Sequence, residues 1–229
     1  MSGSLELVKQ LREITGAGML DCKKYLEQAN NNLEEAVKLF RSESGKKAEK
    51  KGSRIAAEGL VNFYENSHCL LILELNSETD FVAKDNNFIA LAQSVANELL
   101  NKEESEAQQS IAEMINTSIS KLGENIKLRR YFKIDKKNNV YGYSHNNKIV
   151  SMVELKSSDE ILAKDICMQI VASNPLAIDE SLLDKDILKS EKDIYKQELD
   201  NLDKKEDIKR NILEGKMKKF INDNTLLNQ

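Results

Sequence analysis

The chain has 229 residues, of which 40% are hydrophobic, so it is long enough for one large domain or for two to three small ones. Aromatic residues make up only 5% and tryptophan is absent, which favours cores of leucine, isoleucine, valine and alanine over a large β-sandwich. With 34 basic and 38 acidic side chains the formal net charge is -4, and this acidic balance argues against bulk electrostatic binding of nucleic acid.

Residues 1–44 predict a small module of three amphipathic helices. The apolar face of the first helix consists of Leu5, Val8 and Leu11. After a break that contains two glycines, a second helix is predicted over residues 19–29. Asn32, with Glu35 three residues later, resembles a capping box and predicts a third helix over residues 33–40. A bundle of this size has a small core, which suits a docking module.

Residues 45–54 are rich in charge and poor in apolar side chains. This composition predicts a linker that is in part helical. Its lysines, like Arg129 and Arg130 further along, could suggest an RNA site. Because acidic residues stand among these cations and aromatic residues are not interleaved with them, solvated faces are favoured.

From Ile55 onward the pattern changes to strands and helices, and it occurs twice. Residues 73–77 are echoed 80 positions later by residues 153–157, and residues 82–85 are echoed by 162–165 at the same offset. This repetition predicts a duplicated α+β core, with one unit over residues 55–135 and a second over 136–187.

Each copy predicts a hairpin followed by a helix. The first copy has strands over 60–64 and 70–75 and a helix over 88–100; the second has strands over 140–143 and 149–155 and a helix over 161–172. A further helix, apolar on one side, is predicted between them over residues 104–121. The charge-laced residues 188–222, with a turn at 200–207, predict an antiparallel helical hairpin that projects from the body.

Several classes of protein are disfavoured. The three cysteines are far apart and show no zinc-site spacing, and no phosphate loop or nucleophile motif is present, so we expect neither an enzyme nor a bound metal or cofactor. His68 and Cys69 are neighbours in a strand and face opposite ways, so they do not form a nucleophile–base pair. No apolar stretch approaches the roughly 20 residues that span a bilayer, which predicts a soluble cytoplasmic protein without a membrane partner.

The segment after the apolar run 70–75 is the most informative part of the chain. It reads Ser-Glu-Thr-Asp-Phe-Val-Ala-Lys and places Phe81 at a junction between strand and helix. Taken alone, Phe81 would be a core residue that caps the next helix, and Thr79 and Asp80 would be ordinary helix N-cap residues. The second copy has Ile161 in place of Phe81, so function is expected where the copies differ.

A set of motifs, taken together, resembles the bacterial elongation factor Ts family. In order, they are residues 11–24 (LREITGAGMLDCKK), 56–59 (AAEG), 78–84 (ETDFVAK), 123–126 (GENI) with Arg129 and Arg130, and 214–220 (EGKMKKF). The resemblance spans nearly the whole chain. It implies an α+β fold with an N-terminal three-helix ubiquitin-associated-like module, a duplicated two-part core with small antiparallel sheets, and a protruding antiparallel coiled-coil hairpin. It also implies a guanine-nucleotide exchange factor for elongation factor Tu.

The resemblance assigns roles to residues at matching positions. Thr79, Asp80, Phe81 and Val82 match the segment that displaces Mg²⁺ from the partner, with Phe81 as a wedge between two helices of the GTPase domain. Arg12, Met19 and Leu20 match the N-terminal surface that docks on the same domain, although helical packing alone would place one of Met19 and Leu20 in the bundle core. His145 matches a contact from the second core unit.

Three departures from the family pattern accompany this resemblance. Tyr25 stands where a small residue is usual, and Asn146 and Asn147 replace a glycine pair in a turn that asparagine can also form. Residues 223–229 are expected to be the start of a truncated or shortened C-terminal part.

One rival hypothesis uses the same residues differently. In it, the three-helix module captures a peptide or a ubiquitin-like protein, and the chain is an adaptor without exchange activity. The hairpin is consistent with a stalk or with a dimer surface, so a homodimer remains open. Direct contact with nucleic acid is not expected.

Overall fold

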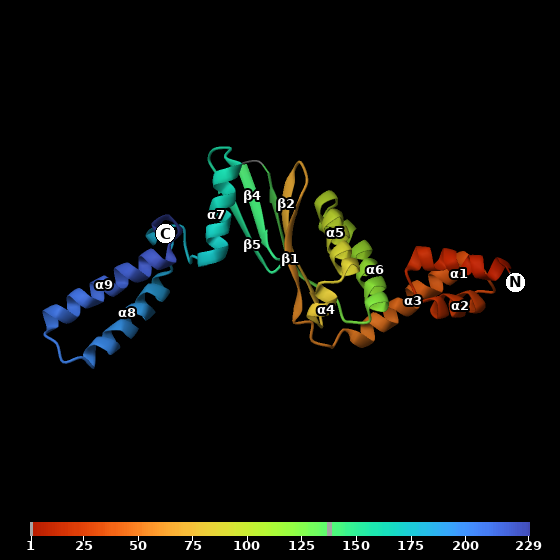
Figure 1. Ribbon diagram of the computed structural model, residues 1–229, viewed down its shortest axis with the longest axis horizontal. Coiled ribbons are helices and arrows are strands. Elements are labelled where there is room, and N and C mark those ends of the chain that lie inside the picture. Colours follow the sequence, from red (N-terminus) through yellow and green to blue (C-terminus); the bar gives the residue numbers. More distant parts are fainter. Residues whose placement is uncertain (1, 137–138) are drawn as a thin grey trace. The chain divides into compact units, whose positions relative to one another are not determined.

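The computed structural model describes residues 2–136 and 139–229, and its contacts divide the chain into two units, Met1–Asp159 and Glu160–Gln229 (Figure 1). The boundary falls inside residues 136–187, which the sequence repeat groups as one core unit. Within the described residues the fold is α+β, with helices at the N-terminus and small antiparallel sheets, as the sequence predicts.

The first unit begins with the predicted three-helix module. Its helices are α1 (Ser2–Thr15), α2 (Met19–Gln28) and α3 (Leu33–Lys51). The predicted cap is confirmed, since the Asn32 side chain accepts a hydrogen bond of 3.2 Å from the backbone N–H of Glu35. Tyr25 is buried and packs edge-to-face on Phe40, with ring centroids 5.9 Å apart. The module core consists of Val8, Leu11, Ala17, Cys22, Tyr25, Leu26, Ala29, Ala36 and Phe40.

The charged segment expected to be a linker is largely helical, because α3 continues through it to Lys51. Tertiary contacts account for this. Ala48 is buried in the core of the neighbouring sheet, and the Lys51 ammonium group donates to the carbonyl of Gly123. Arg41 also lies 3.9 Å from the carboxylate of Glu113 on a later helix, α6 (Glu104–Leu122). The helix is therefore stabilised by packing that charge patterning alone does not reveal.

A three-stranded antiparallel sheet forms the centre of the first unit. Its order is β1-β2-β3, with β1 at Glu58–Glu65, β2 at Cys69–Ser77 and β3 at Lys127–Asp135. Helices α5 (Asn86–Asn101) and α6 (Glu104–Leu122) lie on one face (Figure 1). Their apolar sides and the strands share a core that includes Leu71, Leu73, Leu75, Phe88, Val95 and Leu99. The edge strand β3 is absent from the sequence-based prediction.

Gly59 on β1 has a backbone conformation that other residues rarely adopt. Its φ is +147°, and a Cβ atom there would lie 2.2 Å from the carbonyl oxygen of Leu75 on the paired strand β2. We expect Gly59→Ala to lower the free energy of unfolding by about 2–3 kcal/mol, through backbone strain and this clash. Chemical denaturation would measure the change.

Gly45→Ala is the matched control for this substitution. Gly45 lies inside α3, and an added Cβ would meet nothing within 4 Å. Because alanine is favoured over glycine in a helix interior by roughly 1 kcal/mol, this variant is expected to be slightly more stable than the natural chain. Equal effects of the two substitutions would contradict a local backbone cause at Gly59.

A second hairpin completes the first unit. Strands β4 (Asn139–His145) and β5 (Ile149–Leu155) form a two-stranded antiparallel sheet, and Gly142 of β4 packs against the ring of Phe63 on β1. The connecting turn has Asn146 and Asn147 at φ of 52° and 54°, as expected for asparagine in place of glycine. The carbonyl of Asn147 accepts a 2.8 Å hydrogen bond from Val61 N–H, so this turn contacts β1.

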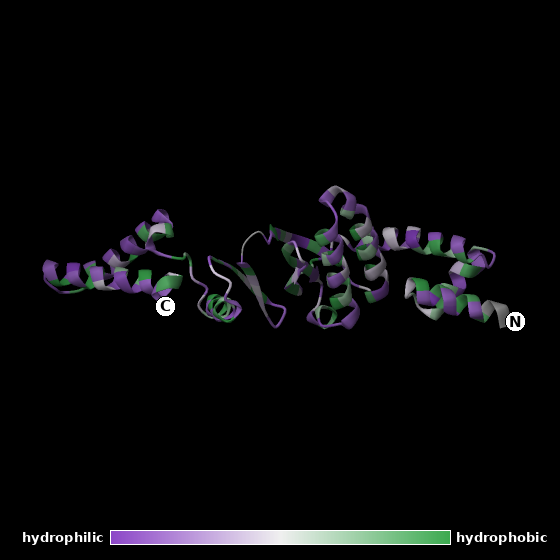
Figure 2. Cartoon of the chain, turned by 90° about the horizontal axis from the view of Figure 1, so that it is seen from above, coloured by the Kyte–Doolittle hydropathy of each residue, from purple (hydrophilic) through white to green (hydrophobic). Residues whose placement is uncertain are grey.

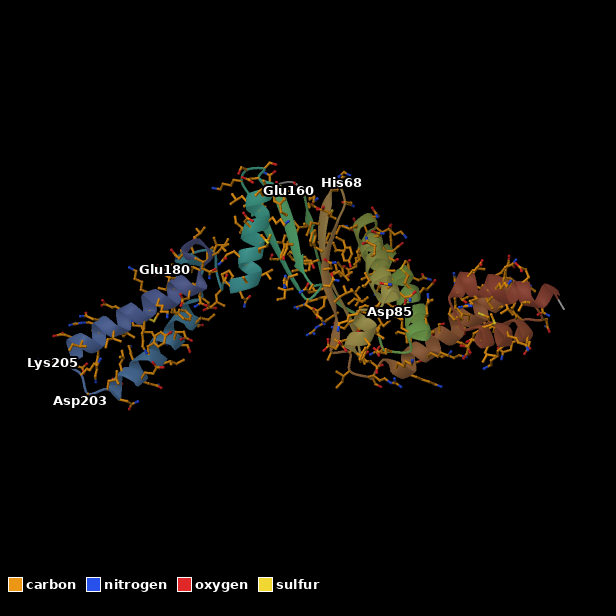
Figure 3. All side chains as sticks on the ribbon, in the orientation of Figure 1. His68, Asp85, Glu160, Glu180, Asp203 and Lys205 are labelled. Atoms are coloured by element: carbon orange, nitrogen blue, oxygen red, sulfur yellow. The ribbon has the colours of Figure 1, made fainter. Side chains whose placement is uncertain are left out.

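The second unit contains the helix of the second repeat and the predicted hairpin. Helix α7 spans Glu160–Ser173, and the hairpin consists of α8 (Lys185–Asp200) and α9 (Glu206–Asn224), with one-turn 3₁₀ helices at Glu180–Leu182 and Leu226–Asn228. Asp203 and Lys205 lie at the hairpin tip and Glu180 at its base (Figure 3). Hydrophilic residues cover most of both helices (Figure 2), and Lys216 of α9 lies 5.0 Å from the ring centroid of Tyr195 on α8.

No helix in the described ranges is both long enough and apolar enough to cross a bilayer. The hairpin–helix order predicted for each copy of the repeat is confirmed, since β1 and β2 precede α5, and β4 and β5 precede α7.

Candidate functional site

A one-turn helix at the end of β2 displays Phe81 to solvent. This helix, α4, spans Asp80–Ala83 and begins after Thr79, whose hydroxyl accepts a hydrogen bond of 3.4 Å from Val82 N–H. Asp85 comes next as the cap of α5 (Figure 3). Phe81 is 81% exposed. Its interpretation as a core residue is therefore wrong, and the ring is available to another molecule.

Four residues hold α4 at its N-terminus, and we call them the α4 clamp: Glu78, Thr79, Glu124 and Asn125. The Glu124 carboxylate accepts the Thr79 N–H at 3.0 Å and the Thr79 hydroxyl at 2.6 Å. In return, the Glu78 carboxylate accepts the Asn125 N–H at 2.7 Å. Arg54 adds an ion pair of 3.5 Å to Glu78. These charge-assisted bonds fix the backbone that carries Phe81.

The two neighbours of Phe81 in α4 have different environments. Val82 is partly buried against the core, whereas the Asp80 carboxylate forms an exposed ion pair of 2.7 Å with Lys84. The hydrogen bond from Lys84 and its charge lower the pKa of Asp80, so this carboxylate is ionised at neutral pH. Phe81 therefore stands beside a fixed negative charge, with Val82 as its anchor to the core.

His145 lies at the end of β4, at the turn of the second hairpin. Its ring nitrogens lie 3.3 Å from the Tyr143 hydroxyl and 3.2 Å from the Asn146 side-chain nitrogen. Lys148, just past this turn, forms a 3.0 Å ion pair with Glu58 at the start of β1 and also contributes to the lowered pKa of Asp80. The turn that carries His145 therefore lies against β1, the strand that α4 also contacts.

The three N-terminal candidates lie in the separate three-helix module, beside the break between α1 and α2. Arg12 is exposed near the end of α1, and its carbonyl accepts a 2.7 Å bond from Gly16 N–H. Met19 is 48% exposed and Leu20 is 85% exposed. The expectation that one of them belongs to the bundle core is wrong, because the buried face of α2 consists of Cys22, Tyr25 and Leu26.

The sequence alone assigns no role in the site to Glu78, Glu124 or Asn125. Residues 123–126 appear there only as a matching motif, without a function. The sequence shows only a glycine and two polar residues after the helical pattern of residues 104–121. In the structure Gly123 ends α6 in the left-handed conformation, Asn125 is buried and Glu124 is half-buried. Pairing across 45 residues of sequence is invisible without the fold.

The α4 clamp can be tested by a single substitution. Glu124→Gln keeps the size of the side chain, but it removes the charge and replaces one acceptor of Thr79 with a donor. We expect this variant to lose about 1.5 kcal/mol of stability, the order of magnitude for a charge-assisted hydrogen bond. Denaturant unfolding measures it, with Glu106→Gln on the exposed side of α6 as the control for the same chemical change. A loss of the same size in both variants would contradict the clamp.

The arrangement favours recognition of another molecule. In residues 2–136 and 139–229, no group of three or more histidine, cysteine, aspartate or glutamate side chains is placed to hold a metal ion. A rigid ring held away from the body provides a large contact area at a low entropic cost.

Comparison with known proteins identifies relatives of the chain. The sequence model of the family described as "Elongation factor TS" matches residues 78–229, and that of the "UBA-like domain" matches residues 5–47. The chain is 39% identical to Elongation factor Ts of Alkalilimnicola ehrlichii, over the whole of this chain and 82% of the relative. It is 41% identical to Elongation factor Ts of Clostridium acetobutylicum, over 99% of this chain and 80% of the relative.

Proposed function

Because the chain belongs to the elongation factor Ts family, we propose a mechanism in which it promotes GDP release from elongation factor Tu through the surface around Phe81. The chain is a guanine-nucleotide exchange factor of translation elongation. Since elongation takes place at translating ribosomes, the proposal includes a cytoplasmic location. It requires neither nucleic acid nor a second copy of the chain.

A physical constraint determines how such a factor works. It must bind the nucleotide-free or distorted form of its partner more tightly than the GDP-bound form, and GDP then weakens binding of the factor by the same ratio. Mg²⁺ neutralises charge on the nucleotide phosphates, so moving the groups that hold it weakens GDP binding. No covalent bond is made or broken by this chain in the exchange step.

Phe81 is the observation that supports this mechanism most directly. Its ring is exposed on a helix whose start is fixed by the α4 clamp, so little conformational entropy is lost when the ring enters the partner. In the proposal Phe81 separates two helices of the partner's GTPase domain, Thr79 and Val82 hold the wedge in place, and the charge of Asp80 competes for the partner's hydrogen-bond donors.

Two other surfaces assist docking in the same proposal. Arg12, Met19 and Leu20 contact the GTPase domain from the three-helix module, and His145 provides a contact from the second hairpin. Exposure of Leu20 and the position of His145 at a turn support these assignments.

GDP release from purified elongation factor Tu tests the function directly. With a fluorescent GDP analogue bound and excess GTP added, the chain is expected to accelerate dissociation in proportion to its concentration. Absence of acceleration at any concentration would refute the proposal. Binding of a ubiquitin-like protein by the three-helix module, together with that absence, would favour the adaptor hypothesis instead.

A further inference from the structure

Three large hydrophobic side chains are more exposed than all others in the described part of the chain. They are Leu20, Ile55 and Phe81, at 85%, 84% and 81%. The proposed function gives roles to Leu20 and Phe81, but it gives none to Ile55. An isoleucine displayed this fully keeps its apolar surface in water, at a cost that burial against a partner would remove.

Ile55 is connected to the α4 clamp through its neighbour Arg54. The Arg54 guanidinium lies 3.5 Å from the Glu78 carboxylate, and its backbone carbonyl accepts a 2.7 Å hydrogen bond from the side chain of Asn125. These two partners, Glu78 and Asn125, both belong to the α4 clamp that positions Phe81. The loop with Ile55 and the helix with Phe81 are therefore parts of one hydrogen-bonded assembly.

The loop that carries Ile55 is ordered on both sides. Arg54 N–H donates to the Lys51 carbonyl at 2.9 Å where α3 ends, and Glu58 begins the pairing of β1 with β2 a few residues later. Glu58 is held by its ion pair with Lys148. A side chain held in this way loses little freedom when it is covered, which is the condition for an effective contact.

We infer that Ile55 is a third apolar anchor for the partner GTPase, adjacent to the contact made by Phe81. This inference rests on the proposed function and extends it to a residue outside the matching motifs. It commits to elongation factor Tu as the molecule that covers Ile55, because the α4 clamp joins this loop to the proposed wedge. A second copy of the chain is the competing occupant.

Thiol protection tests the inference without relying on activity. Cys22, Cys69 and Cys167 are all buried, so Ile55→Cys introduces a thiol far more accessible than the native ones. Its alkylation by iodoacetamide, followed by mass spectrometry of the peptide that contains it, is expected to slow by at least 10-fold when nucleotide-free elongation factor Tu is added. Ile161→Cys is the matched control, since Ile161 is 78% exposed and has no role in the proposed contact.

The energetic test uses Ile55→Ser, with Ile161→Ser as the control. Burial of an isoleucine predicts that Ile55→Ser weakens binding of nucleotide-free elongation factor Tu by roughly 10-fold, whereas Ile161→Ser leaves the Kd unchanged. Both variants should keep the natural melting temperature, because both side chains are exposed.

The outcomes separate this inference from the proposed function. If the natural chain accelerates GDP release but the introduced thiol at position 55 stays equally reactive with the partner, the inference is wrong and the function stands. If the natural chain does not accelerate GDP release, both the inference and the proposed function are wrong. Protection of the thiol in the chain alone, increasing with its concentration, would identify a second copy as the occupant and overturn the inference.

Discussion

Phe81→Ala is expected to reduce the acceleration of GDP release by about 30-fold or more, the loss typical when a central aromatic anchor is removed from an interface. The ring is 81% exposed, so the variant should fold and melt like the natural chain. Its loss removes the surface that is proposed to distort the GTPase, while docking through the other surfaces remains. Stopped-flow measurement of GDP dissociation over a range of factor concentrations would quantify the effect.

Phe132→Ala provides the matched control for Phe81. Phe132 is 59% exposed on the edge strand β3, and it plays no part in the proposed contact. The control variant should accelerate GDP release as the natural chain does. If removal of either ring reduced exchange equally, the specific role of α4 would be contradicted. Full activity of Phe81→Ala would place the wedge elsewhere on the molecule.

Phe88→Ala is expected to cause the largest loss of stability among the substitutions considered. Phe88 is fully buried where α5 packs on the central sheet. Truncation of a buried phenylalanine leaves a cavity and costs about 3–5 kcal/mol. For a chain of this length that loss corresponds to a fall in melting temperature of about 10 °C. Calorimetry and denaturant unfolding would both measure it.

Opposite effects are expected at the two phenylalanines, although only seven positions separate them in the sequence. Phe81→Ala should lose exchange activity and keep stability, whereas Phe88→Ala should lose stability first. A small effect of Phe88→Ala on unfolding would mean that the core rearranges to fill the cavity, and the packing described for α5 would be wrong.

Most helices and hairpins could be predicted from local patterns because their apolar periodicity is strong. The edge strand β3 could not be predicted in this way, because exposed basic residues interrupt its alternating pattern. Helices α5 and α6 also separate β3 in the sequence from its partner strand β2. Positively charged side chains on such an edge oppose pairing with another chain. The basic side chains that protect this edge from pairing with another chain therefore also make the strand hard to recognise in the sequence.

The candidate site was predicted unevenly for a similar reason. Phe81 could be identified because a large aromatic at a strand-to-helix junction is conspicuous in the sequence itself. Glu124 and Asn125 could not be assigned, since their partners lie 45 and 47 residues away. Ile55 carried no signal at all, because exposure of one isoleucine in a polar loop depends on which side chains the fold leaves uncovered.

Helix α3 couples two hydrophobic cores with a fixed angle and spacing. Phe40 belongs to the core of the three-helix module and Ala48 to the core of the central sheet, and one unbroken helix joins them. Each residue added to such a helix rotates the downstream part by about 100° and displaces it by about 1.5 Å. Insertion of one residue between Phe40 and Ala48 would rotate one of these side chains out of its core. Insertion of about seven residues, close to two full turns, would return both side chains to the faces that their cores require. In evolution, this segment should therefore tolerate substitution far better than a change in length.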